Sequence, residues 1–418
     1  MPAKLNATNT AGNRNRTVTD GKGPNVTPAT QTPAIDRDRL TKIITDLVSI
    51  PSVTGDEAEI MEFVAGICEG AGIDFTVTAK DPERPNVVAS IGNGNGPTIA
   101  MNGHLDTVPV SDEHRWVTPP LEGVLSQDGR MIFGRGSADM KGSVGVMLYT
   151  IMALKDAGLT GTLQAHIVSD EERGADFGTR HLLSEIEAGN LPKPDYVLIG
   201  ESSQLKVRNA ERGIFGFKVR FIGRASHTAS ARVSGINAIA LAAKGILAIE
   251  GDIDKEHPAV GKPVISVNMI EAGIANNVVP GECTITVDRR TIPGETDQSV
   301  LAEVREVLED VKERDPNFDY EIIPSRDEGY TPANITDQTS PVVVALQDAI
   351  RDVTGEEPEY FATWAGATDG RLYRFAGIDT VGYGPSGQNA HGANEGVYVD
   401  DLITQAQVYQ VLARKLLA

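Results

Sequence analysis

Acidic and histidine side chains follow several short apolar runs in this chain of 418 residues. The positions concerned are His104 with Asp106, the triplet 170–172, Glu201 and His391. Each apolar run has the length of a buried strand, and ligands of open α/β sheets bind at the carboxyl ends of the strands. We therefore expect these side chains to gather at one edge of a sheet.

Two of these acidic segments have more than one interpretation. Asp139 lies in a glycine-rich loop at the start of the apolar helix predicted for residues 140–156, where an N-cap aspartate is as expected as a ligand. The carboxylates of residues 170–172 form either a solvated acidic turn or a group neutralised by a cation. If the segment is extended, neighbouring side chains point to opposite sides, so one glutamate can bind a metal ion while the other acts as a base.

Together these positions offer two imidazoles and at least three carboxylates. This ligand set suits a pair of borderline divalent ions, most naturally Zn²⁺, with Co²⁺ or Mn²⁺ as substitutes. Asp106, two residues from His104, is placed to fix the orientation of a metal-binding imidazole. No P-loop and no dinucleotide fingerprint occurs, which disfavours a phosphate-handling enzyme.

From about residue 36 to its end, the chain resembles the two-zinc peptidases and deacylases. This family includes succinyl-diaminopimelate desuccinylase, acetylornithine deacetylase, aminoacylase and glutamate carboxypeptidase. The motifs that carry the resemblance are GHLDTVP at 103–109, GRGSADMKG at 134–142, DEE at 170–172, GE at 200–201, and GATDGR at 366–371 followed by His391.

The resemblance implies a role for each residue of the metal site. His104 and Glu201 would hold one zinc ion, Glu172 and His391 the other, and Asp139 would bridge the two. Asp106 would orient His104, and Glu171 would be the general base that takes a proton from the water shared by the ions. The resemblance also implies a cis peptide bond between Asp139 and Met140.

The same resemblance implies residues that contact the substrate. His227 would stabilise the tetrahedral oxyanion, reaching the site of the other subunit of a homodimer. Asn277 and Arg290 would bind the substrate carboxylate, for which an arginine fork is well suited. Gly366 and Thr368 match the substrate-facing loop of the family.

The elements that position these residues alternate between strands and buried helices, typical of a sheet covered on both faces. From near residue 211 the order changes to β-α-β-β-α-β. We predict an α/β catalytic domain at 36–210 and 330–418, with a mixed sheet covered by helices. A small α+β, ferredoxin-like domain inserted at 211–329 would dimerise by pairing sheet edges.

Composition limits the partners and the location. The formal net charge of −20 repels nucleic acid. No segment is long and apolar enough for a membrane span, and residues 1–35 read as a disordered or draped tail without a signal peptide, so a cytoplasmic location is expected. The two cysteines, Cys68 and Cys283, are expected to be buried free thiols.

The predicted function is hydrolysis of the amide bond of a small N-acyl amino acid, as in the deacetylases and desuccinylases. The alternative is a di-zinc carboxypeptidase or dipeptidase acting on short peptides. The desuccinylase usually has Arg-Arg-Gly-Ser where this chain has Glu-Arg-Gly-Ile at 211–214, a departure that bears on diaminopimelate as the substrate. A binding protein that has lost catalysis is disfavoured because Glu171 and every expected ligand are intact.

Overall fold

The computed structural model describes residues 34–324, 330–361 and 366–418. Almost all of the tail predicted for residues 1–35 therefore lies outside the described residues. Among the helices that are described, none is long and apolar enough to cross a lipid bilayer. Cys68 and Cys283 are buried free thiols, as predicted.

The larger sheet has six strands and is mixed, in agreement with the predicted fold class. Its strand order is β1 (Asp74–Thr78), β2 (Asn86–Gly92), β6 (Thr162–Val168), β3 (Thr98–His104), β7 (Tyr196–Ile199) and β17 (Asp379–Gly382). The last four strands run parallel to one another, whereas β1 and β2 are joined in antiparallel fashion. The carboxyl ends of β6, β3 and β7 consequently lie next to each other.

Helices cover both faces of this sheet, and the alternation of strand side chains shows which face each residue serves. Val87 and Ala89 of β2 belong to the main hydrophobic core, whereas Val88 packs with Leu182 of the opposite layer. The helices whose residues line the main core are α1 (Arg37–Val48), α2 (Ala58–Ala71), α3 (Gly142–Leu154), α8 (Pro341–Thr354) and α10 (Val399–Leu417). The other layer contains α4 (Thr179–Glu187) and α9 (Gly370–Phe375).

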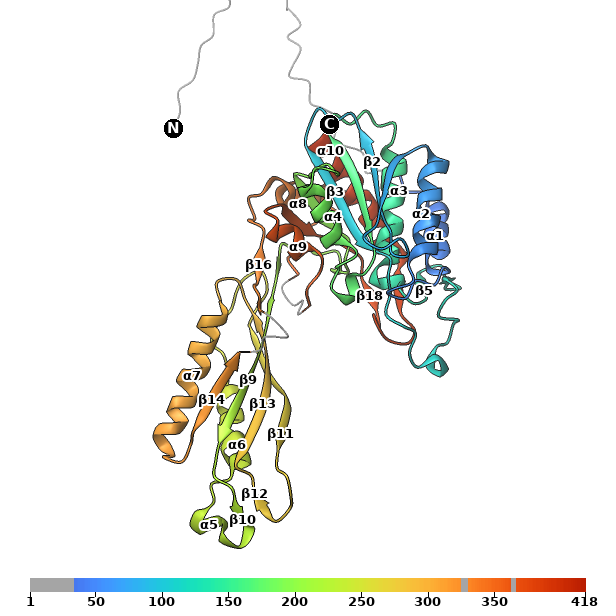
Figure 1. Cartoon of the computed structure of the whole chain (residues 1–418). Coiled ribbons are helices and arrows are strands. Elements are labelled where there is room, and N and C mark those ends of the chain that lie inside the picture. The colour runs from blue at the N-terminus through green and yellow to red at the C-terminus, as the bar shows by residue number, and fades with distance from the viewer. Residues whose placement is uncertain (1–33, 325–329, 362–365) are drawn as a thin grey trace, which may run out of the picture. The chain divides into compact units, whose positions relative to one another are not determined.

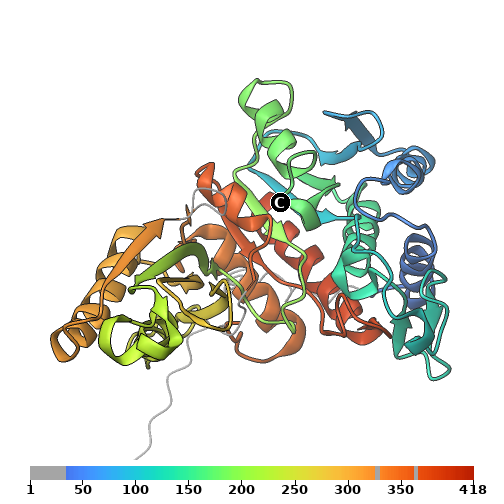
Figure 2. The same ribbon diagram turned by 60° about the horizontal axis from the view of Figure 1, so that its bottom comes forward.

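Segments far apart in the sequence meet in the main core. The C-terminal helix α10 packs against α3 and α8, and α3 also packs against α1 (Figures 1 and 2). Helix α3 is buried over nearly its whole length, which explains why its sequence is apolar on most faces. A four-stranded sheet lies near its start and consists of β4 (Val124–Leu125), β5 (Met131–Phe133), β18 (Gly387–Gln388) and β19 (Gly396–Tyr398).

A second sheet follows the predicted β-α-β-β-α-β order. It contains β9 (Gly213–Ile222), β11 (Val264–Ala272), β13 (Glu282–Thr291), β14 (Tyr320–Pro324) and the short β15 (Tyr330–Thr331), all antiparallel. Alternate residues of β9 and β13, such as Phe217 and Ile285, form a core with α6 (Ala238–Ile249) and α7 (Asp297–Arg314). The limits of this unit as a domain and its role in dimerisation stay predictions.

Two short strands connect the second sheet to the rest of the chain. β8 (Ala210–Glu211) enters it, β16 (Asn334–Ile335) leaves it, and the two pair with each other.

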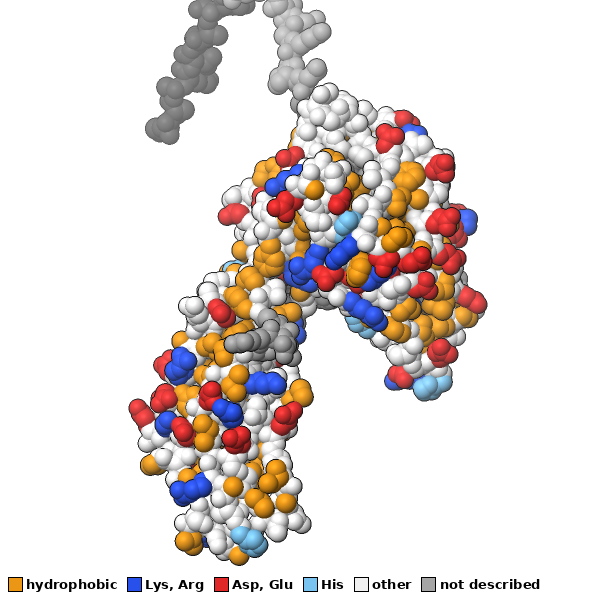
Figure 3. Space-filling view, in the orientation of Figure 1, with side chains coloured by type: hydrophobic (Ala, Val, Ile, Leu, Met, Phe, Trp, Pro, Cys, Tyr) orange, Lys and Arg blue, Asp and Glu red, His pale blue; other side chains and the backbone are white. Residues whose placement is uncertain are grey.

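Charged side chains of both signs are interspersed over the face shown in Figure 3.

Candidate metal centre

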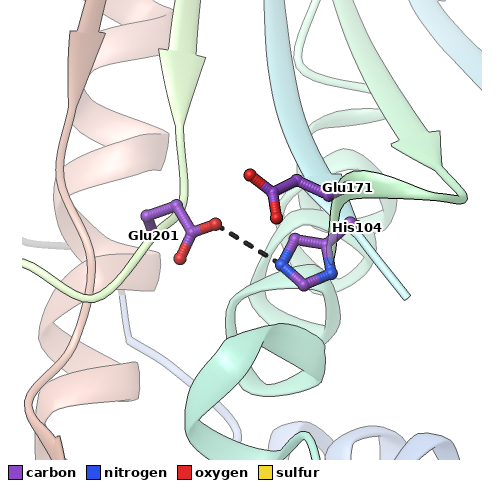
Figure 4. Close-up of side chains that lie close together, drawn as sticks. All are labelled: His104, Glu171 and Glu201. Carbon is purple, nitrogen blue, oxygen red and sulfur yellow. Dashed lines mark ion pairs between the residues drawn. The ribbon is translucent and has the colours of Figure 1, made fainter. Parts of the chain in front are cut away.

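Three parallel strands deliver the first side chains of the cluster. β3 extends to His104 itself, so the imidazole projects from the last residue of the strand. Glu171 lies in a turn after β6, and Glu201 lies two residues beyond β7. Figure 4 shows these three side chains converging from the ends of their strands.

The segment that carries Asp139 is a turn, not the first part of the helix. Residues Ser137–Lys141 form a single wide turn in which Asp139 and Met140 have non-helical backbone angles. The N-cap residue of α3 is Lys141, so the interpretation of Asp139 as an N-cap is wrong. The cis peptide bond between Asp139 and Met140 is present as predicted.

The candidate ligands form two adjacent groups. In one, ligand atoms of His104, Glu171 and Glu201 lie within 4.8 Å of one another, and in the other those of Asp139, Glu172 and His391 do. Asp139 joins the groups, because one of its oxygens is 3.2 Å from His104 Nε2 and the other is 3.2 Å from His391 Nε2. The five ligands expected from the sequence are therefore brought together, with Glu171 beside them.

The donor atoms fit a pair of divalent ions. Nε2 of His104 lies 3.4 Å from Glu201 Oε1, and Nε2 of His391 lies 2.9 Å from Glu172 Oε1. In both rings it is Nε2 that faces the carboxylate oxygens. The donor atoms of each histidine–glutamate pair therefore converge on one small volume. Imidazole nitrogen and carboxylate oxygen in this proportion suit borderline metals such as zinc.

Hydrogen bonds between the two imidazoles and the neighbouring carboxylates shift the pKa values of this cluster. Burial favours the neutral ring of His104, but its hydrogen bonds with Asp106, Asp139 and Glu201 raise the pKa well above the usual value. The hydrogen bond with Asp139, aided by Glu172, raises the pKa of His391 to about 9. Burial opposes ionisation of Asp139, yet the two imidazoles lower its pKa. The surrounding acidic groups thus favour the protonated forms of both imidazoles.

Metal binding is expected to strengthen as the pH rises from 6 towards 9. A metal ion needs neutral imidazole, so binding must release the proton that His391 holds below a pKa of about 9. The apparent association constant should rise by about tenfold per pH unit for each proton released. Cobalt titrations followed by absorbance, at a series of pH values, measure this slope. An association constant that is independent of pH would contradict it.

Asp106 contacts the two glutamates of the site as well as His104. It is fully buried, and its carboxylate lies 3.4 Å from His104 Nδ1, which also contacts the Asp106 backbone oxygen at 2.9 Å. The same carboxylate accepts hydrogen bonds from the backbone N–H groups of Glu171 and Glu172, at 3.0 and 3.2 Å, and from the Thr54 hydroxyl. It thus connects the orientation of His104 to that of the two glutamates.

Substituting Asp106→Asn is expected to lower metal affinity and hydrolysis by about 10- to 100-fold, the usual cost of losing an outer partner of a metal ligand. The amide keeps one acceptor oxygen but loses the charge and the second acceptor. Competition with a chromogenic chelator measures the affinity. Exposed Asp128 provides the control Asp128→Asn, which should behave like the wild type. Equal affinities for all three proteins would contradict this role.

Glu395 is a buried residue whose part in the site was missed at the sequence level. Its Oε1 accepts from the backbone N–H groups of Ala138 and Asp139, at 3.0 and 3.1 Å, and its other oxygen pairs with buried Arg135. Since it lies four residues after His391, it ties the His391 loop to the Asp139 turn. The acidic residue was visible in the sequence, but nothing in its spacing indicated a contact with residues 138–139.

The predicted oxyanion and carboxylate-binding residues lie on the second sheet and its loops. His227 is exposed on β10 (Ser226–His227), and its ring accepts from the Ala229 N–H. Exposed Asn277 is close by, because its carbonyl accepts from the Thr228 N–H. Arg290 pairs with Asp288 on β13. In the described part of the chain, no hydrogen bond or ion pair joins any of the three to the metal-site cluster.

The predicted substrate-facing turn leads into α9. Gly366 is half-buried, whereas Thr368 is buried and both its N–H and its hydroxyl donate to the Glu211 carboxylate. The next residue, Asp369, accepts from Thr179 and adds to the negative charge around Glu171. The side chain of Thr368 is thus directed at the interior of the protein.

Imidazole and carboxylate ligands at the ends of parallel strands, with one more carboxylate beside them, define a metal-dependent hydrolase. Residues 100–415 match the model of peptidase family M20/M25/M40, and the chain belongs to this family. A succinyl-diaminopimelate desuccinylase of Marinobacter nauticus is 30% identical over 384 residues, which cover 89% of this chain and 97% of the relative. The family assignment from the sequence is confirmed.

Solved structures show the same fold. The aminopeptidase PepT of Bacillus cereus superposes with a TM-score of 0.73 at 21% identity, covering 91% of this chain and 99% of that chain. The YXEP protein of Bacillus subtilis, described as a dinuclear metal-binding peptidase, has a TM-score of 0.68 at 20% identity, covering 91% and 98%.

Proposed function

We propose that this hydrolase cleaves the amide bond of small N-acyl amino acids with two zinc ions. The observation that carries the proposal is the convergence of five ligands from distant segments with Glu171 beside them. Relatives that cover most of the chain are named succinyl-diaminopimelate desuccinylases. Their name favours an N-acyl amino acid over a longer peptide as the substrate.

In this proposal the two groups of side chains have separate tasks. His104 and Glu201 would hold one ion, Glu172 and His391 would hold the other, and Asp139 would serve both. Two ions at these positions would supply a water of lowered pKa and a Lewis acid for the amide carbonyl. Asp106 fixes the His104 ring and the two glutamate backbones, so the ligands are in place before the substrate arrives.

Glu171 is the proton carrier. A carboxylate oxygen of Glu171 lies within 4.8 Å of ligand atoms of His104 and Glu201, close enough to reach a water held by an ion at that group. Burial raises the pKa of Glu171 well above its usual value, which suits a group that must take up a proton and then release it. The carboxylate accepts the proton of the attacking water and passes it to the departing amine nitrogen.

The second sheet and the turn before α9 would bind the substrate. Arg290 and Asn277 would bind its carboxylate, His227 would donate to the oxyanion from the second subunit of a homodimer, and the backbone near Gly366 and Thr368 would face the acyl group. Exposed Met269 and Ile270 on strand β11, at the edge of the second sheet, support edge-to-edge pairing of two copies.

The homodimer is tested by light scattering on the eluting protein. We expect twice the chain mass, and Met269→Lys, which places a charge on the β11 edge, should shift the protein towards monomer. A monomer at all concentrations would contradict the dimer and the contribution of His227 from a second subunit.

The function is tested with zinc-loaded protein and a panel of N-acetyl amino acids, N-succinyl amino acids and dipeptides, with amine release as the readout. We expect the acyl amino acids to be cleaved fastest and a chelator to abolish the reaction. A dipeptide preference would instead support the alternative of a di-zinc dipeptidase or carboxypeptidase, in line with the peptidases among the solved structures. No cleavage of any member would favour a binding protein.

A further inference from the structure

The three adjacent carboxylates of residues 170–172 have three different environments. Glu171 and Glu172 face the two ligand groups, whereas Asp170 faces away from them. Its Oδ1 pairs with Arg84 Nη2 at 2.5 Å, and its Oδ2 accepts from the backbone N–H of Phe177 at 3.1 Å. The segment is a tight turn and not extended, with Asp170 in the left-handed region at φ 66°.

Arg84 connects this turn to a second buried acid. Its Nη2 and Nε pair with the two oxygens of Glu57, at 2.8 and 3.1 Å, at the start of α2. Its guanidinium also lies 4.4 Å from the ring centre of Phe177. The Arg84 side chain is only 12% exposed and Glu57 is fully buried, so solvent screens these contacts little.

Asn86, two residues further on, holds both ends of the same turn. Its amide nitrogen donates to the Phe177 carbonyl at 2.8 Å, and its oxygen accepts from the Ser169 N–H at 3.1 Å. The Ser169 hydroxyl in turn donates to the Arg84 carbonyl at 3.3 Å. Residues 84–86, which lead into β2, therefore contact residues 169, 170 and 177 but not the two glutamates between them.

We propose that residues 84–86 form a clamp that fixes the turn 169–177, and that Arg84 is a positioning residue for Glu171 and Glu172. The inference rests on the proposed roles of those glutamates as base and ligand. By pairing with Asp170, Arg84 neutralises the one carboxylate of the triplet that faces neither ligand group. Without it, three like charges adjoin in one turn with no cationic side chain paired to Asp170, and the contacts of Asn86 and Asp106 alone would have to hold the turn against their repulsion.

The test compares Arg84→Met, Arg84→Lys and Asp170→Asn with the wild type. Arg351→Met is the matched control, because Arg351 also bridges two carboxylates, Asp348 and Glu357, but on the surface of α8. Four quantities are measured for each protein: hydrogen exchange of the amides of 169–177, the affinity for the zinc ion that Glu172 and His391 would hold (the second zinc ion), kcat and KM. Asp170→Asn keeps the size of the side chain, so it carries the test if Arg84→Met does not fold.

In Arg84→Met and Asp170→Asn we expect exchange in 169–177 to rise at least tenfold while α3 stays protected. The affinity for the second zinc ion and kcat should each fall by about 10- to 100-fold, with KM within about twofold. Arg84→Lys should recover part of both losses, and Arg351→Met should match the wild type.

Two results would overturn the clamp. One is unchanged exchange and zinc affinity in both variants, and the other is faster exchange in all segments alike, which indicates a general loss of stability. Exchange and zinc affinity do not depend on turnover. If the wild type cleaves no substrate of the panel, the proposed function fails while the clamp is still tested.

Discussion

Replacing Glu171 with glutamine is expected to lower kcat by roughly 10²- to 10⁴-fold, the contribution of a positioned general base. Glutamine has nearly the same shape, so the turn and the contacts of its backbone N–H with Asp106 should remain. It cannot accept a proton, so the water is not activated and the amine leaves unprotonated. Substrate affinity and the two bound zinc ions should be retained. Turnover of the best panel substrate and metal analysis of the same sample measure both quantities.

Exposed Glu187 on α4 provides the control Glu187→Gln, which should turn over like the wild type. If Glu171→Gln retained more than about a tenth of the wild-type kcat, another group would have to carry the proton. If it lost one zinc ion, Glu171 would instead be a ligand, as its proximity to His104 and Glu201 also allows.

Asp139→Asn is expected to remove activity and to weaken both metal sites. The Asp139 carboxylate lies 3.2 Å from each of the two histidine nitrogens, so its charge belongs to both ligand groups at once. An amide offers one neutral oxygen in place of two charged ones. The loss in affinity should exceed the 10- to 100-fold that an outer partner costs. Calorimetric zinc titration, with the number of sites and both affinities fitted, measures the effect.

His391→Ala separates the two sites in the same experiment. His391 belongs to one group only, so this variant should weaken one site and spare the one formed by His104 and Glu201. If Asp139→Asn and His391→Ala gave the same pattern, with one site intact in both, Asp139 would not be shared between the ions.

Much of the fold was predictable because its signals are local. The apolar helix predicted for residues 140–156 is present as α3 (Gly142–Leu154), and the β-α-β-β-α-β order predicted from near residue 211 is also present. The convergence of the five expected ligands was also predictable, since each stands at or just beyond the end of an apolar run or in a family motif. The structure also decides between the interpretations left open for two turns: Asp139 is no N-cap, and residues 170–172 form a tight turn.

The partners of the ligands could not be predicted in the same way. Arg84 and Glu395 are ordinary charged residues in the sequence, and each gains its role from a partner many positions away, Asp170 and Asp139 respectively. Pairings of this kind follow from the packing of strands and turns, not from spacing. For Thr368 the motif indicated a substrate contact, and the structure adds a partner inside the protein, because its hydroxyl donates a hydrogen bond to Glu211.

The ligands come from both ends of the folded chain, since His104 lies on an early strand and His391 in a loop just before the final helix. Two ions held by these ligands, with Asp139 shared between the two groups, would link the two ends, and the unfolded chain offers no equivalent site. Free zinc at about 100 times the dissociation constant of a site should therefore add about 2.7 kcal/mol per site to the free energy of unfolding. The melting temperature therefore reports how much zinc the protein has bound.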